Sequence, residues 1–270
     1  MKFHLLIPCV VLSLGAGAQD YQSITNASVT NIDHGSDDVR YYSLNSKYYF
    51  DKKSILGPVD QFSYINTISN FSASYTQWDN LLNEDNSHLK SISGEVFINR
   101  FMFSASSSQA DTYGLDNDNT SVSVGYLLND DLLVSSTASK HDGQSTQVSF
   151  SAKYNHQLNR TDYFGITANI DDNLENENIS ATYFSHLANG KYIKLTADYS
   201  VQEHAENNWH VKGQYFFTDY TSAFLSQKKE NTREVGMKHF FNDHIGLSAS
   251  YINSNDSDIN SVNLTMTLQL

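Results

Sequence analysis

The sequence predicts an all-β fold: a transmembrane antiparallel up-and-down β-barrel of about 16 strands. Three observations support this prediction. Apolar and polar residues alternate along many short segments, turn-forming residues separate the segments, and no segment beyond the N-terminus is apolar for the roughly 18 to 20 residues of a membrane helix. Only helices and closed barrels satisfy all backbone hydrogen bonds in lipid, so a membrane protein with this pattern should be a barrel.

The composition agrees with strands that have one apolar and one polar face. The chain is 39% hydrophobic and contains 17 Tyr and 15 Phe, yet its formal net charge is −13 and only 17% of its residues are charged. The mean hydropathy is negative. These values fit half-apolar strands, whereas buried parallel strands would read as continuous apolar runs.

The N-terminus has the layout of a secretory signal peptide over residues 1–18. A positive charge near the start precedes an apolar run at 5–14, and small residues precede the expected cleavage site. Cleavage would leave residues 19–270 as the barrel. The alternative is an apolar helix kept in the mature chain, but the run is too short to span a bilayer. Cys9 is the only cysteine, so the mature chain should contain no disulfide.

The alternation is clearest at the C-terminus, where VNLTMTLQL (262–270) places every second residue on an apolar face up to the last position. A barrel has no free edge, so this last strand should pair with the first, near residues 21–32. The same period of two recurs at 121–128, 147–154, 164–170, 193–201, 209–217 and 245–251. We count sixteen strands of about 9 to 12 residues. Fourteen remains an alternative, because the alternation slips between Tyr64 and Phe71, as a β-bulge within 51–79 would make it.

Two kinds of connection separate these segments. Short ones rich in Asn, Asp and Gly suit tight hairpin turns; they lie at 128–130, 158–160, 189–190, 218–219 and 242–243. The others are longer and acidic, at 34–38, 78–88, 112–119, 171–178, 203–207 and 253–258. This asymmetry predicts short periplasmic turns and longer acidic extracellular loops.

Eight charged residues are predicted to point inward and line a pore, because they alternate with the apolar residues of their strands. They are Lys47, Glu95, Lys153, Lys194, Asp198, Lys212, Glu234 and Lys238. A charge that faced lipid at mid-depth would cost about 2–4 kcal/mol, which supports the inward assignment. Rings of charge set ion preference in pores. The alternative is that the lysines and acids pair along the wall and only hold its shape.

The selectivity of such a pore is predicted to be weak. Acidic residues at the outer mouth would concentrate cations, whereas the deeper lysines would favour anions. Sixteen strands enclose a lumen that side chains alone do not fill. The outer connections at 78–88 and 109–119 are short for an inward fold. The lumen would thus be wide, narrowed by side chains such as Phe97 and Phe184, or partly closed by the N-terminal segment.

Several stretches resemble the general porins of Gram-negative (marine gammaproteobacterial) outer membranes. They are YQSITNASVTNID (21–33), the segment from SLNSKYYFD to SASYTQWD (43–79) and the FFND turn (240–243). The C-terminal VNLTMTLQL is similar to the signal that barrel-assembly machinery reads, although Leu270 stands where that pattern has Phe.

The resemblance implies an integral outer-membrane protein that contacts lipid and lipopolysaccharide. It also implies binding of the assembly machinery through residues 262–270 and a passive channel for small hydrophilic solutes. Both a homotrimer and a monomer are compatible with it.

Other functional classes find less support in the sequence. There is no HExxH, GxSxG, metal-spaced Cys/His or phosphate-loop motif, so no catalytic residue, metal or cofactor is expected. No basic patch interleaved with aromatics suggests nucleic acid. The acidic run at 116–119 lacks the Gly and Glu of an EF-hand loop. The rival hypothesis is a non-conducting structural or adhesive barrel whose acidic loops bind divalent cations or partners.

Overall fold

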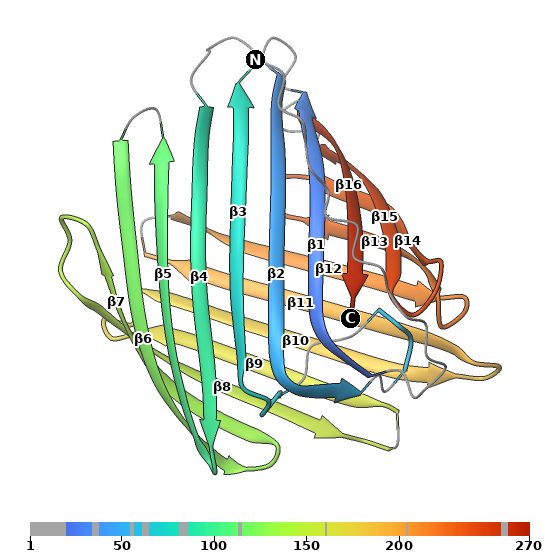
Figure 1. The fold of residues 1–270 in the computed structure, drawn as a ribbon, viewed down its shortest axis with the longest axis horizontal. Helices are drawn as coiled ribbons and strands as arrows, with labels where there is room; N and C mark the ends of the chain where they lie inside the picture. Colours follow the sequence, from blue (N-terminus) through green and yellow to red (C-terminus); the bar gives the residue numbers. More distant parts are fainter. Residues whose placement is uncertain are drawn as a thin grey trace.

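The chain forms a closed antiparallel β-barrel in which each strand pairs with its neighbours in sequence and β1 pairs with β16 (Figure 1). This computed structural model describes residues 20–33, 38–54, 57–60, 65–80, 86–112, 115–159, 161–203, 205–254 and 259–270. The predicted signal peptide lies outside them. The count of sixteen strands is confirmed, and the alternative of fourteen is wrong. None of the described residues belongs to a helix long and apolar enough to cross a membrane.

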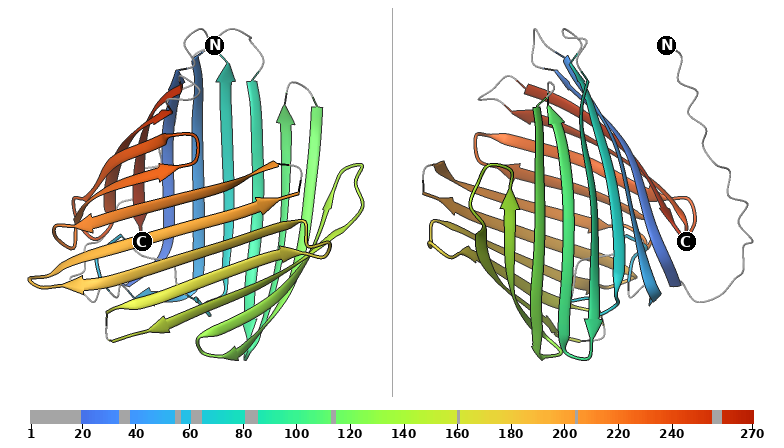
Figure 2. Two further views of the ribbon diagram at one scale, coloured as in Figure 1. Left: turned by 180° about the vertical axis from the view of Figure 1, so that it is seen from behind. Right: turned by 60° about the vertical axis from the view of Figure 1, so that its left-hand side comes forward.

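The strands have the following bounds: β1 (Asp20–Asp33), β2 (Asp38–Ser54), β3 (Asn70–Asn80), β4 (Asn86–Ile98), β5 (Phe101–Thr112), β6 (Leu115–Asn129), β7 (Leu132–His141), β8 (Gln147–Gln157), β9 (Tyr163–Asp171), β10 (Asn176–Leu187), β11 (Lys191–Gln202), β12 (Ala205–Phe216), β13 (Thr221–Lys228), β14 (Thr232–Phe240), β15 (Ile245–Ser254) and β16 (Ile259–Gln269). In Figure 2, strands on opposite walls run in steeply different directions. Strands that tilt the same way around a barrel axis must cross in this manner.

The last strand closes the barrel as predicted. β16 lies between β15 and β1, and its register sets Leu264 opposite Val29 and Met266 opposite Ala27. The Leu270 N–H donates to the Ser23 carbonyl at 2.9 Å. The chain therefore alternates to its last residue because that residue still takes part in the pairing.

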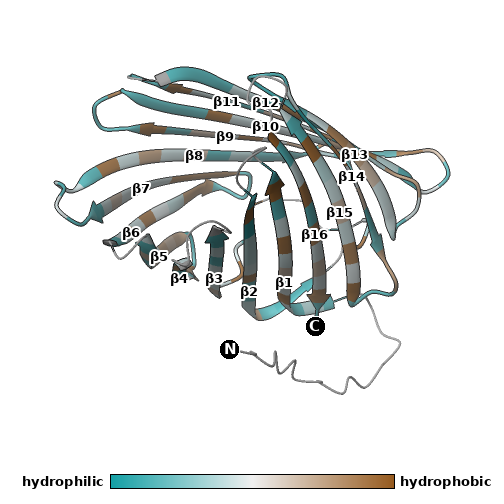
Figure 3. Ribbon diagram, turned by 90° about the horizontal axis from the view of Figure 1, so that it is seen from above, coloured by the Kyte–Doolittle hydropathy of each residue, from teal (hydrophilic) through white to brown (hydrophobic). Residues whose placement is uncertain are grey.

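The two faces of the wall differ as the period of two requires. On β16, Val262 and Leu264 are 54% and 48% exposed, whereas Ser261 and Thr267 are 5% and 3% exposed. Seen from above, apolar and polar bands alternate along β16 and its neighbours (Figure 3). The apolar side chains cover the outside of the barrel, and the polar ones face the lumen.

The connections depart from the sequence prediction at the end where the acidic segments lie, hereafter the acidic end. β5 continues to Thr112 and β6 begins at Leu115, while β9 ends at Asp171 and β10 begins at Asn176. Most residues expected in longer acidic loops are therefore strand residues. Ladder hydrogen bonds with the neighbouring strand outweigh the low strand propensity of Asp and Asn.

The longest interruption between strands lies instead at the opposite end, hereafter the turn end, where β4–β5, β6–β7 and β10–β11 make tight turns. β2 ends at Ser54 and β3 begins at Asn70. The β-bulge expected between Tyr64 and Phe71 is not formed in residues 65–69, which are not strand residues, whereas Tyr64 lies outside the described residues and residues 70–79 do belong to a strand. Pro58 follows Gly57 between β2 and β3, and a proline cannot donate to a sheet ladder. Residues 55–69 are called the β2–β3 connection; residues 57–60 and 65–69 of it are described.

Candidate functional site in the barrel lumen

The inner wall from β3 to β7 is lined by hydroxyl groups. They form hydrogen-bonded pairs across neighbouring strands: Ser72–Ser93 at 2.6 Å, Ser74–Ser91 at 2.6 Å, Ser106–Ser121 at 2.7 Å and Ser123–Thr137 at 2.8 Å. Each hydroxyl keeps further capacity for water or a polar solute. These hydroxyl pairs therefore make this part of the wall hydrophilic without adding charge to it.

The eight charged residues predicted from the sequence all lie on strands, on the face opposite the exposed apolar residues. Leu195, Val211 and Met237 are 46%, 46% and 57% exposed on the outside. Their neighbours in sequence, Lys194, Lys212 and Lys238, accordingly point toward the lumen. Lys47, Glu95, Lys153, Asp198 and Glu234 alternate with outward residues in the same way.

These residues do not form one ring. Lys194, Lys212 and Lys238 gather near β11, β12 and β14, whereas Lys47 and Lys153 lie on β2 and β8. Three acids have neutral or histidine partners. Glu95 accepts a hydrogen bond from Asn70 at 3.1 Å, Asp198 lies 3.1 Å from His210 Nδ1, and Glu234 accepts from Ser226 at 3.3 Å.

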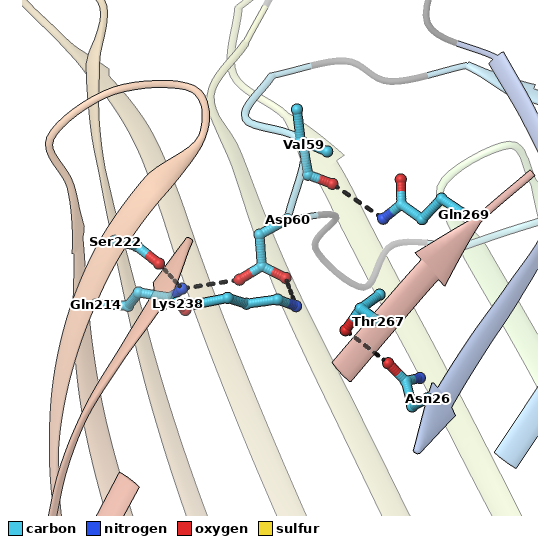
Figure 4. A network of polar contacts seen from close by, with 8 residues as sticks. All are labelled: Asn26, Val59, Asp60, Gln214, Ser222, Lys238, Thr267 and Gln269. Carbon is cyan, nitrogen blue, oxygen red and sulfur yellow. Dashed lines mark hydrogen bonds and ion pairs between the residues drawn. The ribbon is translucent and has the colours of Figure 1, made fainter. Parts of the chain in front are cut away.

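Lys238 and Gln214 contact Asp60, an acidic residue of the β2–β3 connection (Figure 4), and Lys194 and Lys212 are close enough to act on it electrostatically. Lys238 Nζ donates to Asp60 Oδ1 at 2.7 Å, and Gln214 Nε2 donates to Asp60 Oδ2 at 2.9 Å. Gln214 also donates to the Ser222 hydroxyl at 2.9 Å. The side chains of Lys238 and Asp60 are only 20% and 23% exposed. Water therefore screens this ion pair less than it screens a surface pair.

The charge state of Asp60 follows from these neighbours. Burial alone would raise the pKa of its carboxyl group. The positive charge of Lys238, hydrogen bonds from Lys238 and Gln214, and the charge of Lys194 act in the opposite direction and hold the pKa below its usual range. Asp60 is consequently a carboxylate at neutral pH.

The described parts of the β2–β3 connection, residues 57–60 and 65–69, contact two different parts of the wall at the turn end. On one side, the Val59 N–H donates to the Asp219 carbonyl at 2.9 Å, and Gln269 Nε2 donates to the Val59 carbonyl at 3.2 Å. Val59 has no exposed surface. Asp219 follows β12, which is six positions from β2 along the order β2-β1-β16-β15-β14-β13-β12.

On the other side, Ile65 packs against a buried cluster of Met102, Leu127 and Leu133 from β5, β6 and β7. Phe97 packs there as well. The connection thus touches two well-separated parts of the wall, one through Val59 and Asp60 and the other through Ile65.

Aromatic rings hold two of the lysines in place. Lys212 Nζ lies 3.6 Å from the centre of the Phe224 ring, and Lys238 Nζ lies 5.1 Å from that of Phe240. Both are cation–π contacts. A Cβ at Gly236 would come within 2.3 Å of the Phe224 ring. Glycine is therefore needed opposite Phe224, which in turn positions Lys212.

The sequence did not indicate Asp60 or Gln214 as site residues. Pro58 is the only proline beyond the predicted signal peptide, so a break in the wall was detectable. The sequence did not show that the residues after Pro58 contact the lumenal wall. The sequence offered the start of the mature chain as a segment that could partly close the lumen. Residues 20–33 instead form β1 in the barrel wall.

Fold and lumen together define the class: a membrane barrel with an apolar outside and a polar inside. A model of the family described as "Putative general bacterial porin" matches residues 2–270. The chain belongs to this family, and it is an integral protein of the bacterial outer membrane. Family and fold indicate a channel rather than an enzyme. In the described ranges, no three His, Cys, Asp or Glu side chains are grouped as a metal site requires.

Solved structures share the fold at low identity. The Acinetobacter baumannii outer membrane protein Omp33 is 17% identical, with a TM-score of 0.58 over 94% of this chain and 100% of that chain. A triple mutant of Rhodopseudomonas blastica porin is 8% identical, with a TM-score of 0.52 over 92% and 99%. Pseudomonas aeruginosa OpdQ is 10% identical, with a TM-score of 0.51 over 93% and 98%. No curated protein sequence matches the chain.

Proposed function

We propose that the protein is a passive, weakly selective channel for small hydrophilic solutes and ions, and that the β2–β3 connection sets its narrowest part. The observation that carries the proposal is the contact of this connection with both sides of a polar lumen, through Asp60 and Ile65. A wall of paired hydroxyls offers passing solutes hydrogen bonds without strong binding.

The proposed weak selectivity rests on charges of opposite sign at the two ends. Acidic residues at the acidic end include Asp33, Asp38, Asp79, Asp111, Asp116 and Glu177. At the turn end, Lys194, Lys212 and Lys238 outnumber the single Asp60 that they surround. The first group favours cations and the second favours anions, so their effects on permeation oppose each other.

The test is the single-channel conductance of the refolded protein in a planar bilayer under a salt gradient. Discrete open steps with a reversal potential close to zero are expected. A large reversal potential would contradict weak selectivity, and its sign would identify the dominant end.

The rival function is a non-conducting barrel whose acidic end binds divalent cations or partners. One observation favours it, because a connection that contacts two separate parts of the lumenal wall could obstruct passage. A protein that inserts and shows the heat-dependent gel mobility of a folded barrel, yet never conducts, would establish the rival.

We further propose that residues 1–18 are removed on export and that assembly machinery recognises residues 262–270. The involvement of Leu270 in the closing hydrogen bonds supports the second point. The mass of the protein isolated from outer membranes tests the first, since a retained signal would add 18 residues. Removal of Leu270 tests the second and should lower the amount of folded barrel in vivo. The lipid and lipopolysaccharide contacts and the homotrimer are proposals too, and native mass spectrometry would count the subunits.

A further inference from the structure

The lysine cluster at the turn end holds more positive charge than its acidic neighbours neutralise. The groups close enough to act electrostatically on Lys212 are Glu234, Asp60, Lys228 and Lys238. Lys194 in turn interacts with Asp60, Lys212 and Lys238. Three ammonium groups at the turn end, those of Lys194, Lys212 and Lys238, thus act on the one carboxylate of Asp60, while Lys228 and Glu234 lie nearer the acidic end of β13 and β14.

Two of these lysines also have unused donors. Lys194 forms no hydrogen bond or ion pair with any residue that the structure describes. Lys212 contacts the Phe224 ring through its ammonium group, and a ring face leaves most of the three N–H donors of that group available. Gln214, which donates to Asp60, lies opposite Lys194 in the β11–β12 register. An amide donor and two incompletely satisfied ammonium groups therefore flank the carboxylate of Asp60.

We infer that Lys194, Lys212, Lys238 and Gln214 form a binding site for the carboxylate group of an anionic solute, and that Asp60 occupies this site in the structure. The arrangement has the features of a ligand site rather than of a simple ion pair. Both carboxylate oxygens have their own donor, at 2.7 Å from Lys238 and 2.9 Å from Gln214. The rings of Phe224 and Phe240 fix two ammonium groups beforehand, which lowers the entropy cost of binding.

The occupant comes from a connection and not from the wall, so it can be exchanged without opening the barrel. Asp60 is attached through Val59, which makes its own hydrogen bonds to Asp219 and Gln269. An incoming carboxylate would replace only the contacts of Asp60. A dicarboxylate could use the excess charge, with its second carboxylate near Lys194 and Lys212. The solute reaches the site from the lumen, and this step rests on the proposed channel function.

As a tethered competitor, Asp60 should weaken the binding of free anions. A group held by a short linker has an effective concentration on the order of millimolar or higher. Removal of the Asp60 charge should therefore tighten the binding of a small dicarboxylate about tenfold or more.

The experiment measures succinate binding to the refolded full-length mature protein in detergent by saturation-transfer NMR. The proteins are wild type, Asp60→Asn, and Asp60→Asn combined with Lys194→Met and Lys238→Met. We expect tighter binding to Asp60→Asn than to wild type, loss of binding in the triple variant, and no signal from the neutral analogue succinamide. The matched control combines Asp60→Asn with Lys140→Met; Lys140 is exposed on β7 near the acidic end, so binding should stay unchanged.

Two outcomes would overturn the inference: equal affinity of wild type and Asp60→Asn, or equal losses in the control and the triple variant. Heat-dependent gel mobility checks that each variant is folded. If the methionine variants do not fold, Lys194→Arg and Lys238→Arg in the Asp60→Asn background replace them, and retained binding is expected because the charge is kept. The assay does not depend on conductance. Succinate binding without conductance would therefore refute the channel function and leave the binding site intact. Conductance without succinate binding would refute the binding site and leave the channel function intact.

Discussion

Asp60 and Lys238 join two parts of the chain that are 178 residues apart, through a hydrogen bond of 2.7 Å. Asp60 belongs to the β2–β3 connection, and Lys238 belongs to β14 in the wall. The bond is charge-assisted and mostly shielded from solvent, and bonds of this kind are about twice as strong as neutral ones. This ion pair is one of several contacts that position the connection, beside the hydrogen bonds of Gln214 and Val59 and the packing of Ile65.

The first prediction concerns the conductance of Asp60→Asn. Loss of a hydrogen bond to a charged group costs about 1.5–3 kcal/mol, so the ratio of held to released connection should fall by roughly one to two powers of ten. Single-channel recordings should then show a larger mean conductance and more frequent changes of current level. Asp142→Asn is the matched control, because Asp142 is an exposed acid after β7 at the other end. A conductance equal to that of wild type would show that Asp60 does not hold the narrow part.

The second prediction is a response to acid. The pKa of Asp60 is lowered in the folded protein, relative to about 3.9 in an unfolded chain. A lowered carboxyl pKa contributes stability that is complete above the unfolded value and is lost as the pH falls through the folded value. The connection should therefore stay held from neutral pH down to about pH 4 and be released only in stronger acid.

Current through wild type should increase below about pH 4, whereas Asp60→Asn should show no such step. Asp162, in the β8–β9 turn, also has a lowered pKa, since hydrogen bonds from His186, Asn159 and Ser185 outweigh burial. It titrates equally in both proteins, so the difference between them isolates Asp60. A step of equal size in both would assign the acid response to another group.

The fold was predictable because the alternation of apolar and polar residues is set locally. On β16, Val262, Leu264 and Met266 face outward along the whole strand, and the sequence alone shows this period. Two features were not local. The extent of β5 and β6 into acidic segments depends on pairing between strands, and the inward path of the β2–β3 connection depends on contacts with β12, β14 and β16.

The sequence could predict that the lysine side chains of the candidate site point into the lumen, but it could not predict that these lysines lie close together. The inward direction of Lys194, Lys212 and Lys238 follows from the same period of two. That they gather around one carboxylate follows from the register of β11 to β14 and from a residue more than a hundred positions away. The roles of all eight predicted residues in permeation remain predictions.

The third prediction tests which face of the wall meets lipid. Arg at Leu195 or Val211, each 46% exposed on the outside, should destabilise the folded barrel by about 2–4 kcal/mol if the position is at mid-depth. Arg at Thr196 should be tolerated, because Thr196 lies opposite Lys212 on the lumenal face. The measurement is the folded fraction in lipid vesicles across a urea series. Equal tolerance at the three positions would reverse the assignment of faces.

The fourth prediction concerns ion preference. Lys153 lies on the lumenal face of β8, opposite Leu133 and Thr167 and apart from the Asp60 cluster. Lys153→Glu should move the reversal potential toward cations, because it reverses a charge along the path. Lys140→Glu is the comparison. Lys140 pairs with Thr120, whereas the adjacent Ser121–Ser139 pair faces the lumen, so Lys140 is on the outer face of β7. Lys140→Glu should therefore change the reversal potential less. Identical shifts would mean that Lys153 acts only through net charge.

The fifth prediction compares two glycines that lie within strands. At Gly236, an added Cβ would lie 2.3 Å from Phe224 Cζ and 2.8 Å from the Ala249 carbonyl oxygen. At Gly213, it would meet Leu195 Cδ2 at 3.7 Å, which is an ordinary contact. Gly236→Ala must displace the Phe224 ring, and overpacking of this kind costs about 1–3 kcal/mol. Gly213→Ala should be close to neutral, so the urea midpoint should fall for the first variant only.

The same variant connects the packing of the wall to the site. The ammonium nitrogen of Lys212 lies 3.6 Å from the centre of the Phe224 ring. Displacement of this ring should therefore also change the position of Lys212 in the lysine cluster. In the Asp60→Asn background, Gly236→Ala should weaken succinate binding, whereas Gly213→Ala should leave it unchanged. If Gly236→Ala lowers the urea midpoint and leaves succinate binding intact, the ring stabilises the wall and does not position Lys212.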